Sequence, residues 1–340
     1  RNALFTYQGR YAVSLVCRAL KIGPGDEVLV PSYNCGAEVD PYLWHGAKAV
    51  FYRVDIGAKA DVEDIKRRVT PVTRLVHITH FFGWPQQIGD LGRWCRDKGL
   101  FLLEDCAHAL FSKGGGGTVI GKIGDAAFYS FVKSLPLPDG GALVVNNRDL
   151  VIAGHAAARS PLLYNVLLAS LPLLKKWVMH KNAFWQRHEC TRRLLTRNWL
   201  KKTIDPGCDV EPEMPVSNYF DGKKIDWTMS RLSRGILGRT EPARIVEIRR
   251  RNYLHLHNAL SGIPAVRRLY ESLPDAVCPL VFPVFVKDRR RWCAELEGRG
   301  ILVGGWPSYH RGFDWAEFPE ARYLKNNLLT LPIHQDLGTD

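Results

Sequence analysis

The chain has 340 residues, of which 46% are hydrophobic and 24% are charged, and its formal net charge is +13 at pH 7. No apolar run reaches the ~18 residues that a membrane-spanning helix needs, and no signal peptide is visible, so we expect a cytoplasmic protein. The positive charge favours anionic partners such as phosphates. No recognisable nucleic-acid motif occurs, so we expect no nucleic-acid partner.

Two kinds of residue that often mark a site carry little signal here. Eight cysteines are scattered without a Cys-x-x-Cys pair or a zinc-binding spacing, which predicts reduced thiols and no metal site. The basic clusters Arg249–Arg251 and Arg289–Arg291 are short and lie in helical patterns. We interpret both clusters as solvated helix faces.

From Tyr11 to Phe131, helical and strand-like segments alternate. The expected helices span residues 11–20, 38–45, 62–68 and 90–98, and the expected strands span 27–30, 49–52, 74–79 and 100–103. Strands separated by helices predict a parallel sheet with helical crossovers, the α/β class. Ligands of such sheets bind at the carboxyl ends of the strands.

The pattern changes after Asn147. Residues 151–225 predict a helical, divergent insert, whose apolar stretch 162–179 is either a lid or dimer-packing segment or a helix lying on a membrane surface. Further on, a helix at 245–260, a strand at 281–286 and a helix at 291–299 indicate a smaller α+β unit. We therefore predict a large domain over 1–240 and a small domain over 241–340.

A lone lysine, Lys133, lies in the otherwise uncharged run 126–138, which ends in apolar and proline residues. Apolar surroundings disfavour the charged ammonium, and a free amine is what a Schiff-base lysine needs. Asp105, 28 residues earlier, follows an apolar strand and could hold a protonated pyridine nitrogen. This pairing suggests a pyridoxal phosphate (PLP) site. The alternative is a lysine at a strand end that reaches solvent.

Several blocks resemble, in order, the DegT/DnrJ/StrS family of sugar aminotransferases, and this chain looks like a divergent member. The blocks are residues 9–13, 23–28 with 30–33, 80–85, 104–108, 124–128, Lys133 with 139–142, and 331–334. The resemblance implies a fold-type I PLP-dependent enzyme. Such an enzyme has a large domain with a mainly parallel sheet between helices and a smaller α+β C-terminal domain.

The resemblance also implies three catalytic roles. Asp105 would pair with the cofactor's ring nitrogen, and Lys133 would bind the cofactor as a Schiff base and later move a proton. His108 stands where the family usually has glutamine, and either side chain could hydrogen-bond the phenolic oxygen. From the residues alone, Asp105 could instead cap a helix, and His108 could be structural.

Phosphate contacts are implied at two places. Gly9, Arg10 and Tyr11 open the first helix, and helix N-termini bind anions. Ser130 matches the family's phosphate-contacting serine. Only two residues separate Ser130 from Lys133, whereas most members have four.

The resemblance gives weaker candidates for the residues that would contact the cofactor ring and the substrate. Cys35 stands where the family often has an aromatic residue over the ring, so Tyr33 is the alternative stacking partner. His310, Arg311 and His334 lie where the family closes the substrate site. His334 could instead only terminate the last strand.

We therefore expect an aminotransferase that moves an amino group, with glutamate as donor, to a nucleotide-linked keto-sugar in cell-surface polysaccharide or secondary-metabolite biosynthesis. A homodimer with shared active sites is implied by the resemblance. One alternative is a PLP enzyme for a lipid-linked or hydrophobic carbonyl compound, in peripheral contact with the membrane. A second is a non-catalytic regulatory protein with the same fold.

Overall fold

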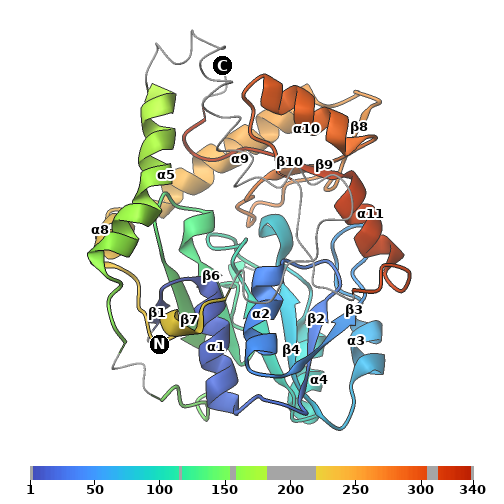
Figure 1. Cartoon of the computed structure of the whole chain (residues 1–340). Helices are drawn as coiled ribbons and strands as arrows, with labels where there is room; N and C mark the ends of the chain where they lie inside the picture. Colours follow the sequence, from blue (N-terminus) through green and yellow to red (C-terminus); the bar gives the residue numbers. More distant parts are fainter. Residues whose placement is uncertain (1–2, 115–116, 154–157, 182–219, 305–312, 338–340) are drawn as a thin grey trace.

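A computed structural model describes residues 3–114, 117–153, 158–181, 220–304 and 313–337. Figure 1 shows a large sheet in the lower part of the view and a smaller sheet with its own helices above it. The described part contains no helix that is both long and apolar enough to cross a bilayer.

The large sheet has seven strands in the order β1-β7-β6-β5-β4-β2-β3. Strands β2 to β6 pair in parallel, whereas β7 is antiparallel to both of its neighbours, β1 and β6. This confirms the predicted α/β class. The strands are β1 (Ala3–Thr6), β2 (Glu27–Pro31), β3 (Lys48–Tyr52), β4 (Thr73–Thr79), β5 (Phe101–Asp105), β6 (Ala126–Ser130) and β7 (Gly141–Val145).

Helices connect these strands at places within two residues of those predicted. Only α3 has the predicted bounds at both ends. Its start is fixed by Asp61, whose side chain accepts a hydrogen bond from the Asp64 N–H in the first turn. The elements are α1 (Gly9–Leu20), α2 (Gly36–Trp44), α3 (Val62–Arg68), η1 (Phe81–Gly83), α4 (Gly89–Asp97) and η3 (Phe131–Lys133).

Alternate strand residues face opposite layers of the molecule. Phe101 and Leu103 of β5 belong to the core cluster shared with α1 and α2, whereas Leu102 belongs to the cluster shared with α3 and α4. Asp105 continues the first series and Glu104 the second. The two acidic neighbours therefore point to opposite faces of the sheet.

The C-terminal part forms a three-stranded antiparallel sheet, β10-β9-β8, with a hydrophobic cluster of its own. The predicted division into domains at residue 240 stays a prediction. The elements after β7 are α5 (Leu163–Lys181), η6 (Gly222–Lys224), α8 (Arg231–Leu237), α9 (Pro242–Ala259), β8 (Val266–Arg268), β9 (Phe282–Val286), α10 (Arg289–Gly298), α11 (Pro319–Asn327) and β10 (Leu328–Leu331).

Candidate active site

The carboxyl ends of β5 and β6 bring the three predicted catalytic residues into one region. Asp105 is the last residue of β5, and His108 lies in the turns that follow it. Lys133 ends η3, directly after β6. Because β5 and β6 are parallel neighbours, both connections leave the same edge of the sheet.

His108 and Lys133 are in direct contact. His108 Nε2 lies 2.9 Å from Lys133 Nζ, and the backbone N–H of Phe82 donates to His108 Nδ1 at 3.3 Å. Burial, and secondly repulsion by a protonated Lys133, lower the pKa of His108 well below its usual value, so the ring is neutral at pH 7. A neutral ring that accepts at Nδ1 has its proton on Nε2. Its Nε2–H can therefore donate to Lys133 Nζ whenever that amine has a free lone pair, which is the form that binds a carbonyl carbon.

Asp105 is only 1% exposed. Its Oδ1 accepts a hydrogen bond from the Ala107 N–H at 2.7 Å, which closes a turn and not a helix. Its Oδ2 lies 3.7 Å from His77 Nε2. A buried carboxylate of this kind can pair with a protonated ring nitrogen, which is the role the sequence predicts.

The start of α1 lies against the end of β6. A Cβ on Gly9 would come within 3.3 Å of both the Ser130 Cβ and the Tyr129 carbonyl oxygen, so glycine allows this close approach. Gln8 makes no side-chain cap, and the first turn, which includes the half-buried Arg10, has no acidic residue. A helix start without a side-chain cap or an acidic first turn, together with Ser130, fits a phosphate group.

Two predicted ring and phosphate contacts lie in packed surroundings. The Tyr11 ring is 2% exposed and packs on Phe220, with centroids 5.2 Å apart. Tyr33 has no exposed surface and packs on Phe81 inside the main core. A ring that stacks on a cofactor must offer one face to the binding site, so Tyr33 does not fit that role. Cys35, the N-cap of α2, is partly exposed and stays the candidate.

These residues fit pyridoxal phosphate. An amine, a neutral imidazole and a buried carboxylate meet beside a helix N-terminus that has no acidic residue in its first turn. Lys133 would hold the cofactor covalently, Asp105 its ring nitrogen, and the start of α1 with Ser130 its phosphate. When bound, the cofactor supplies a ring that withdraws electrons from the reacting carbon.

Two residues that the sequence analysis missed support the loop after Lys133. Arg249 Nη2 and Gln335 Nε2 both donate to the Ser134 carbonyl, at 3.1 and 3.2 Å. Arg249 is 3% exposed and Arg289 is 6% exposed, so the interpretation of both arginine clusters as solvated faces was wrong for these members. Arg249 is buried because four hydrogen-bond acceptors replace water around its guanidinium; they are the carbonyls of Pro279, Leu280 and Ser134 and the side chain of Gln335.

The predicted substrate residues lie at the C-terminal end. His310 and Arg311 fall outside the described residues. His334 follows β10, its carbonyl accepts from Asn252 at 3.3 Å, and its ring lies 3.7 Å from the Asp336 carboxylate. Its neighbour Gln335 is the residue that reaches the loop after Lys133. A role of His334 in substrate binding stays a prediction.

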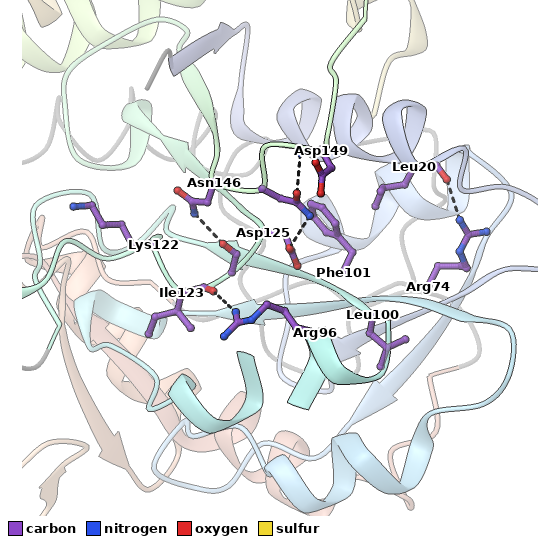
Figure 2. A pocket seen from close by; sticks show the side chains of 13 residues that line it. Leu20, Arg74, Arg96, Leu100, Phe101, Lys122, Ile123, Asp125, Asn146 and Asp149 are labelled. Atoms are coloured by element: carbon purple, nitrogen blue, oxygen red, sulfur yellow. Dashed lines mark hydrogen bonds between the residues drawn. The ribbon is translucent and has the colours of Figure 1, made fainter. Parts of the chain in front are cut away.

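A recess of about 660 Å³ lies at the other end of the large sheet, where β5 begins (Figure 2). Figure 2 shows Arg96 donating to the Ile123 carbonyl and Arg74 to the Leu20 carbonyl. Leu100 and Phe101 form part of its wall. None of the predicted catalytic residues lines this recess, so it is separate from the candidate site.

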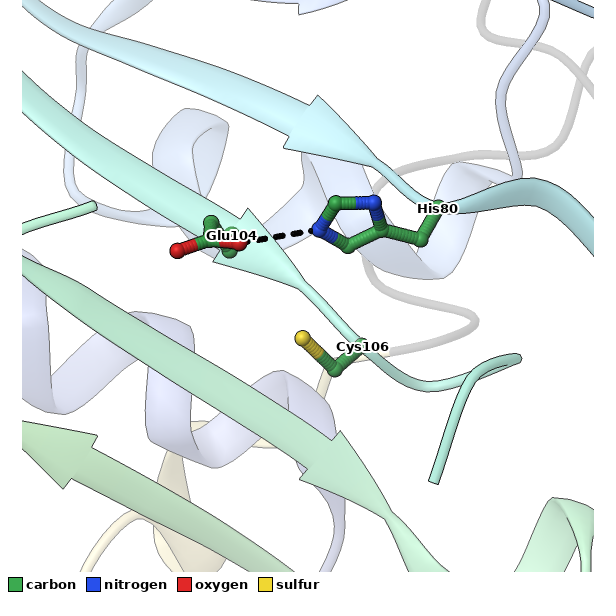
Figure 3. A group of neighbouring side chains, drawn as sticks. All are labelled: His80, Glu104 and Cys106. Carbon is green, nitrogen blue, oxygen red and sulfur yellow. Dashed lines mark hydrogen bonds and ion pairs between the residues drawn. The ribbon is translucent and has the colours of Figure 1, made fainter. Parts of the chain in front are cut away.

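On the opposite face of β5, Glu104 stabilises the chain before β6. His80 points to it from the end of β4 (Figure 3), and their Nε2 and Oε2 atoms are 3.0 Å apart. His80 Nδ1 accepts from the Gln86 N–H, so His80 Nε2 is the donor to Glu104. Burial raises the pKa of Glu104, but hydrogen bonds from His80 and backbone N–H groups outweigh it and lower the pKa overall. This group holds the segment 121–124 in place.

Comparison with solved structures defines the fold. Aminotransferase TlmJ from Streptoalloteichus hindustanus matches 99% of this chain and 81% of its own, with a TM-score of 0.69 and 20% identity. The sugar aminotransferase Spr1654 from Streptococcus pneumoniae, described as putative and solved in its PLP form, matches 99% of this chain and 83% of its own, with a TM-score of 0.68 and 16% identity. The fold is that of the fold-type I PLP-dependent transferases.

Sequence comparison then gives the family. Residues 1–156, which carry all of the sequence motifs except the block 331–334, match the model of the DegT/DnrJ/EryC1/StrS aminotransferase family. This confirms the resemblance found in the sequence, and the family is PLP-dependent.

Curated relatives match the same segment. GDP-perosamine synthase from Vibrio cholerae is 34% identical over 154 residues, which are 45% of this chain and 42% of that protein. The dTDP-4-dehydro-2,3,6-trideoxy-D-glucose 4-aminotransferase of Saccharopolyspora spinosa is 35% identical over 161 residues, 46% and 41% of the two chains. The match thus spans less than half the length of these relatives.

Proposed function

We propose that this protein is a PLP-dependent aminotransferase that transfers an amino group from glutamate to a nucleotide-linked keto-sugar. The observation that carries the proposal is the hydrogen bond between His108 and Lys133, 2.9 Å long, beside the buried Asp105. The names of the relatives include GDP-linked and dTDP-linked sugars, which supports a nucleotide sugar as acceptor. The net charge of +13 is compatible with a diphosphate group.

Each residue of the site has a separate task in this proposal. Lys133 Nζ takes and returns the proton of the substrate carbon, since it is the basic nitrogen of the site. The Nε2–H of His108 orients that nitrogen. Asp105 supplies a buried negative charge that favours a protonated ring nitrogen. A regulatory protein without catalysis would have no need of this set.

The proposal is tested by incubating the protein with pyridoxamine phosphate and a panel of GDP-, dTDP- and UDP-linked keto-sugars. Mass spectrometry should detect a product in which the keto group has become an amine. The Lys133→Ala variant should give none. Amination of hydrophobic ketones alone, with every nucleotide sugar unchanged, would contradict the sugar assignment.

A second candidate, an acceptor at a membrane surface, is favoured by one observation. Leu163, Leu167 and Leu171 of α5 recur every four residues and are 72%, 55% and 56% exposed. At this spacing they share one face of the helix, and α5 lies at the edge of the molecule (Figure 1). A second copy of the chain could equally cover this face, in a homodimer such as the family resemblance implies.

One variant, in which all three leucines are replaced by serine, distinguishes a membrane surface from a second copy of the chain as the partner of this helix face. Loss of flotation with anionic liposomes, without a change in molecular mass, would support the membrane candidate. A dimer that becomes a monomer in light scattering would support self-association. If neither liposome flotation nor molecular mass changes, this helix face binds neither a membrane nor a second copy of the chain.

A further inference from the structure

A second group of ionisable side chains lies behind Asp105. Glu38, His77 and Asp105 are all buried, and their functional atoms lie within 4.8 Å of one another. His77 Nε2 is 3.6 Å from Glu38 Oε2 and 3.7 Å from Asp105 Oδ2. A buried histidine thus stands between two buried carboxylates, only one of which has a predicted role.

The strand register explains why these residues meet. His77 of β4 lies beside Leu103 of β5, and Thr79 lies beside Asp105. His77 and Asp105 are therefore diagonal neighbours on the face of the sheet that α1 and α2 cover. Glu38 lies in the first turn of α2 and completes the group from above that face.

Hydrogen bonds fix the histidine and the glutamate in place. The Tyr42 hydroxyl lies 2.9 Å from His77 Nδ1. The Glu38 carboxylate accepts from the Cys35 N–H at 3.2 Å and from the Thr79 hydroxyl at 3.0 Å. Neither side chain can move away without losing these bonds.

The protonation of His77 follows from its surroundings. Its Nε2 atom is buried and has no hydrogen-bond partner within the described part of the chain. A bare lone pair aimed at two carboxylate oxygens would be repelled, so Nε2 carries a proton. In the neutral ring, Nδ1 then accepts from the Tyr42 hydroxyl.

We propose that His77 is a positioning residue for Asp105: its Nε2–H lies between the two carboxylates, with Nε2 3.7 Å from Asp105 and 3.6 Å from Glu38, and its partial positive charge favours the negative charge on Asp105 that pairs with the cofactor's ring nitrogen. The inference rests on the proposed cofactor site. Without this proton, two carboxylates buried side by side would repel each other, and the pair would take up a proton from solvent. Less negative charge would then face the ring nitrogen.

The other groups around the cluster do not supply such a charge. Burial raises the pKa of Tyr42 and of Tyr52 well above the usual value, so both side chains stay neutral. The remaining group that acts on Glu38 is the lysine that would carry the cofactor. The groups facing the cluster are Tyr42 of α2, Tyr52 of β3, the Phe128 ring of β6, whose centroid is 5.7 Å from that of His77, and Lys133 after η3.

The test compares the affinity of the apoprotein for PLP and for 1-deaza-PLP, which has carbon in place of the ring nitrogen. His77→Phe keeps a planar ring but has no proton to share. It should weaken PLP binding about 10-fold, the effect of one pKa unit, and should leave the affinity for the deaza analogue within about 2-fold. His77→Gln, which retains an N–H donor, should bind PLP nearly as the wild type does. In the His77→Phe background, Glu38→Gln should recover part of the PLP affinity because it removes the competing carboxylate.

Equal weakening of both ligands by His77→Phe, or no weakening of either, would overturn the inference and leave the proposed function standing. A wild-type protein that does not bind PLP would overturn both. If His77→Phe does not fold, nitrogen NMR of labelled histidine in the wild-type protein decides: a protonated His77 Nε2 in the PLP complex supports the inference, and an unprotonated one contradicts it.

Discussion

His108 Nε2 lies 2.9 Å from Lys133 Nζ, and the Phe82 N–H fixes which of the two nitrogens gives the proton. The Nε2–H of His108 can therefore donate to the Lys133 amine when that amine has a free lone pair, the form that reacts with a carbonyl carbon. Burial is the main cause that lowers the pKa of His108 and favours its neutral ring.

Replacing His108 tests this relationship. His108→Ala removes the donor and should lower kcat by about 100-fold, the lower end of effects seen for positioned proton-transfer groups. His108→Gln can accept from Phe82 and donate to Lys133, so it should retain most of the activity. Single-turnover kinetics with glutamate would measure both variants. Equal losses in the two variants would show that the hydrogen bond to Lys133 is not what matters.

The burial of Glu38 predicts a pH dependence of stability. Burial, and secondly the charge of Asp105, raise the pKa of Glu38 from 4.5 to about 7. A carboxyl whose pKa is raised on folding stabilises the fold below the unfolded value and loses that contribution as the pH rises through the folded value. Glu38→Gln should thus match the wild-type melting temperature near pH 4.5 and exceed it at pH 8. A difference that is constant across this range would contradict the raised pKa.

The close approach at Gly9 predicts a steric effect on the phosphate site. Gly9→Val places atoms where only 3.3 Å separates a Cβ from Ser130 and from the Tyr129 carbonyl, so α1 must shift away from β6. PLP affinity should fall by about 10-fold or more, as expected when one or two hydrogen bonds to a charged group are lost. Gly89→Val is the matched control, since Gly89 also begins a helix and has no atom within 4 Å of a Cβ. A similar loss in both variants would point to helix propensity instead of the site.

The burial of Arg249 predicts a large cost for its removal. Arg249→Met leaves the Ser134, Pro279 and Leu280 carbonyls short of a donor, and should destabilise the fold by about 2–4 kcal/mol. The adjacent Arg251→Met, on the exposed side of α9, should change stability by less than about 0.5 kcal/mol. Urea denaturation measures both. Equal effects would mean that the contacts of Arg249 contribute no more than a surface arginine does.

Much of the large sheet and the positions of the candidate catalytic residues follow from the sequence. Apolar runs separated by helical segments predict strands such as β4 and β5. The end of the second run predicts that Asp105 lies at the carboxyl edge of the sheet. Lys133 is conspicuous because its run of neighbours carries no other charge.

The residues that the sequence did not reveal act over long distances. Arg249 reaches a carbonyl 115 positions away, and nothing in a run of three arginines tells which one turns inward. His77 did leave a signal, since it lies in a predicted strand in phase with Asp105. That signal becomes visible only when the register of β4 against β5 is known.

The most direct test of the account is the absorbance of the purified protein with PLP before and after glutamate is added. The wild type should be yellow, with a band near ~420 nm that glutamate bleaches, because a protein-bound imine of the cofactor absorbs in that range. The Lys133→Ala variant should lack this response, while Lys122→Ala, at an exposed lysine beside the distant recess, should behave as the wild type. A Lys133→Ala variant that is equally yellow and equally bleached would contradict the central claim that Lys133 carries the chemistry.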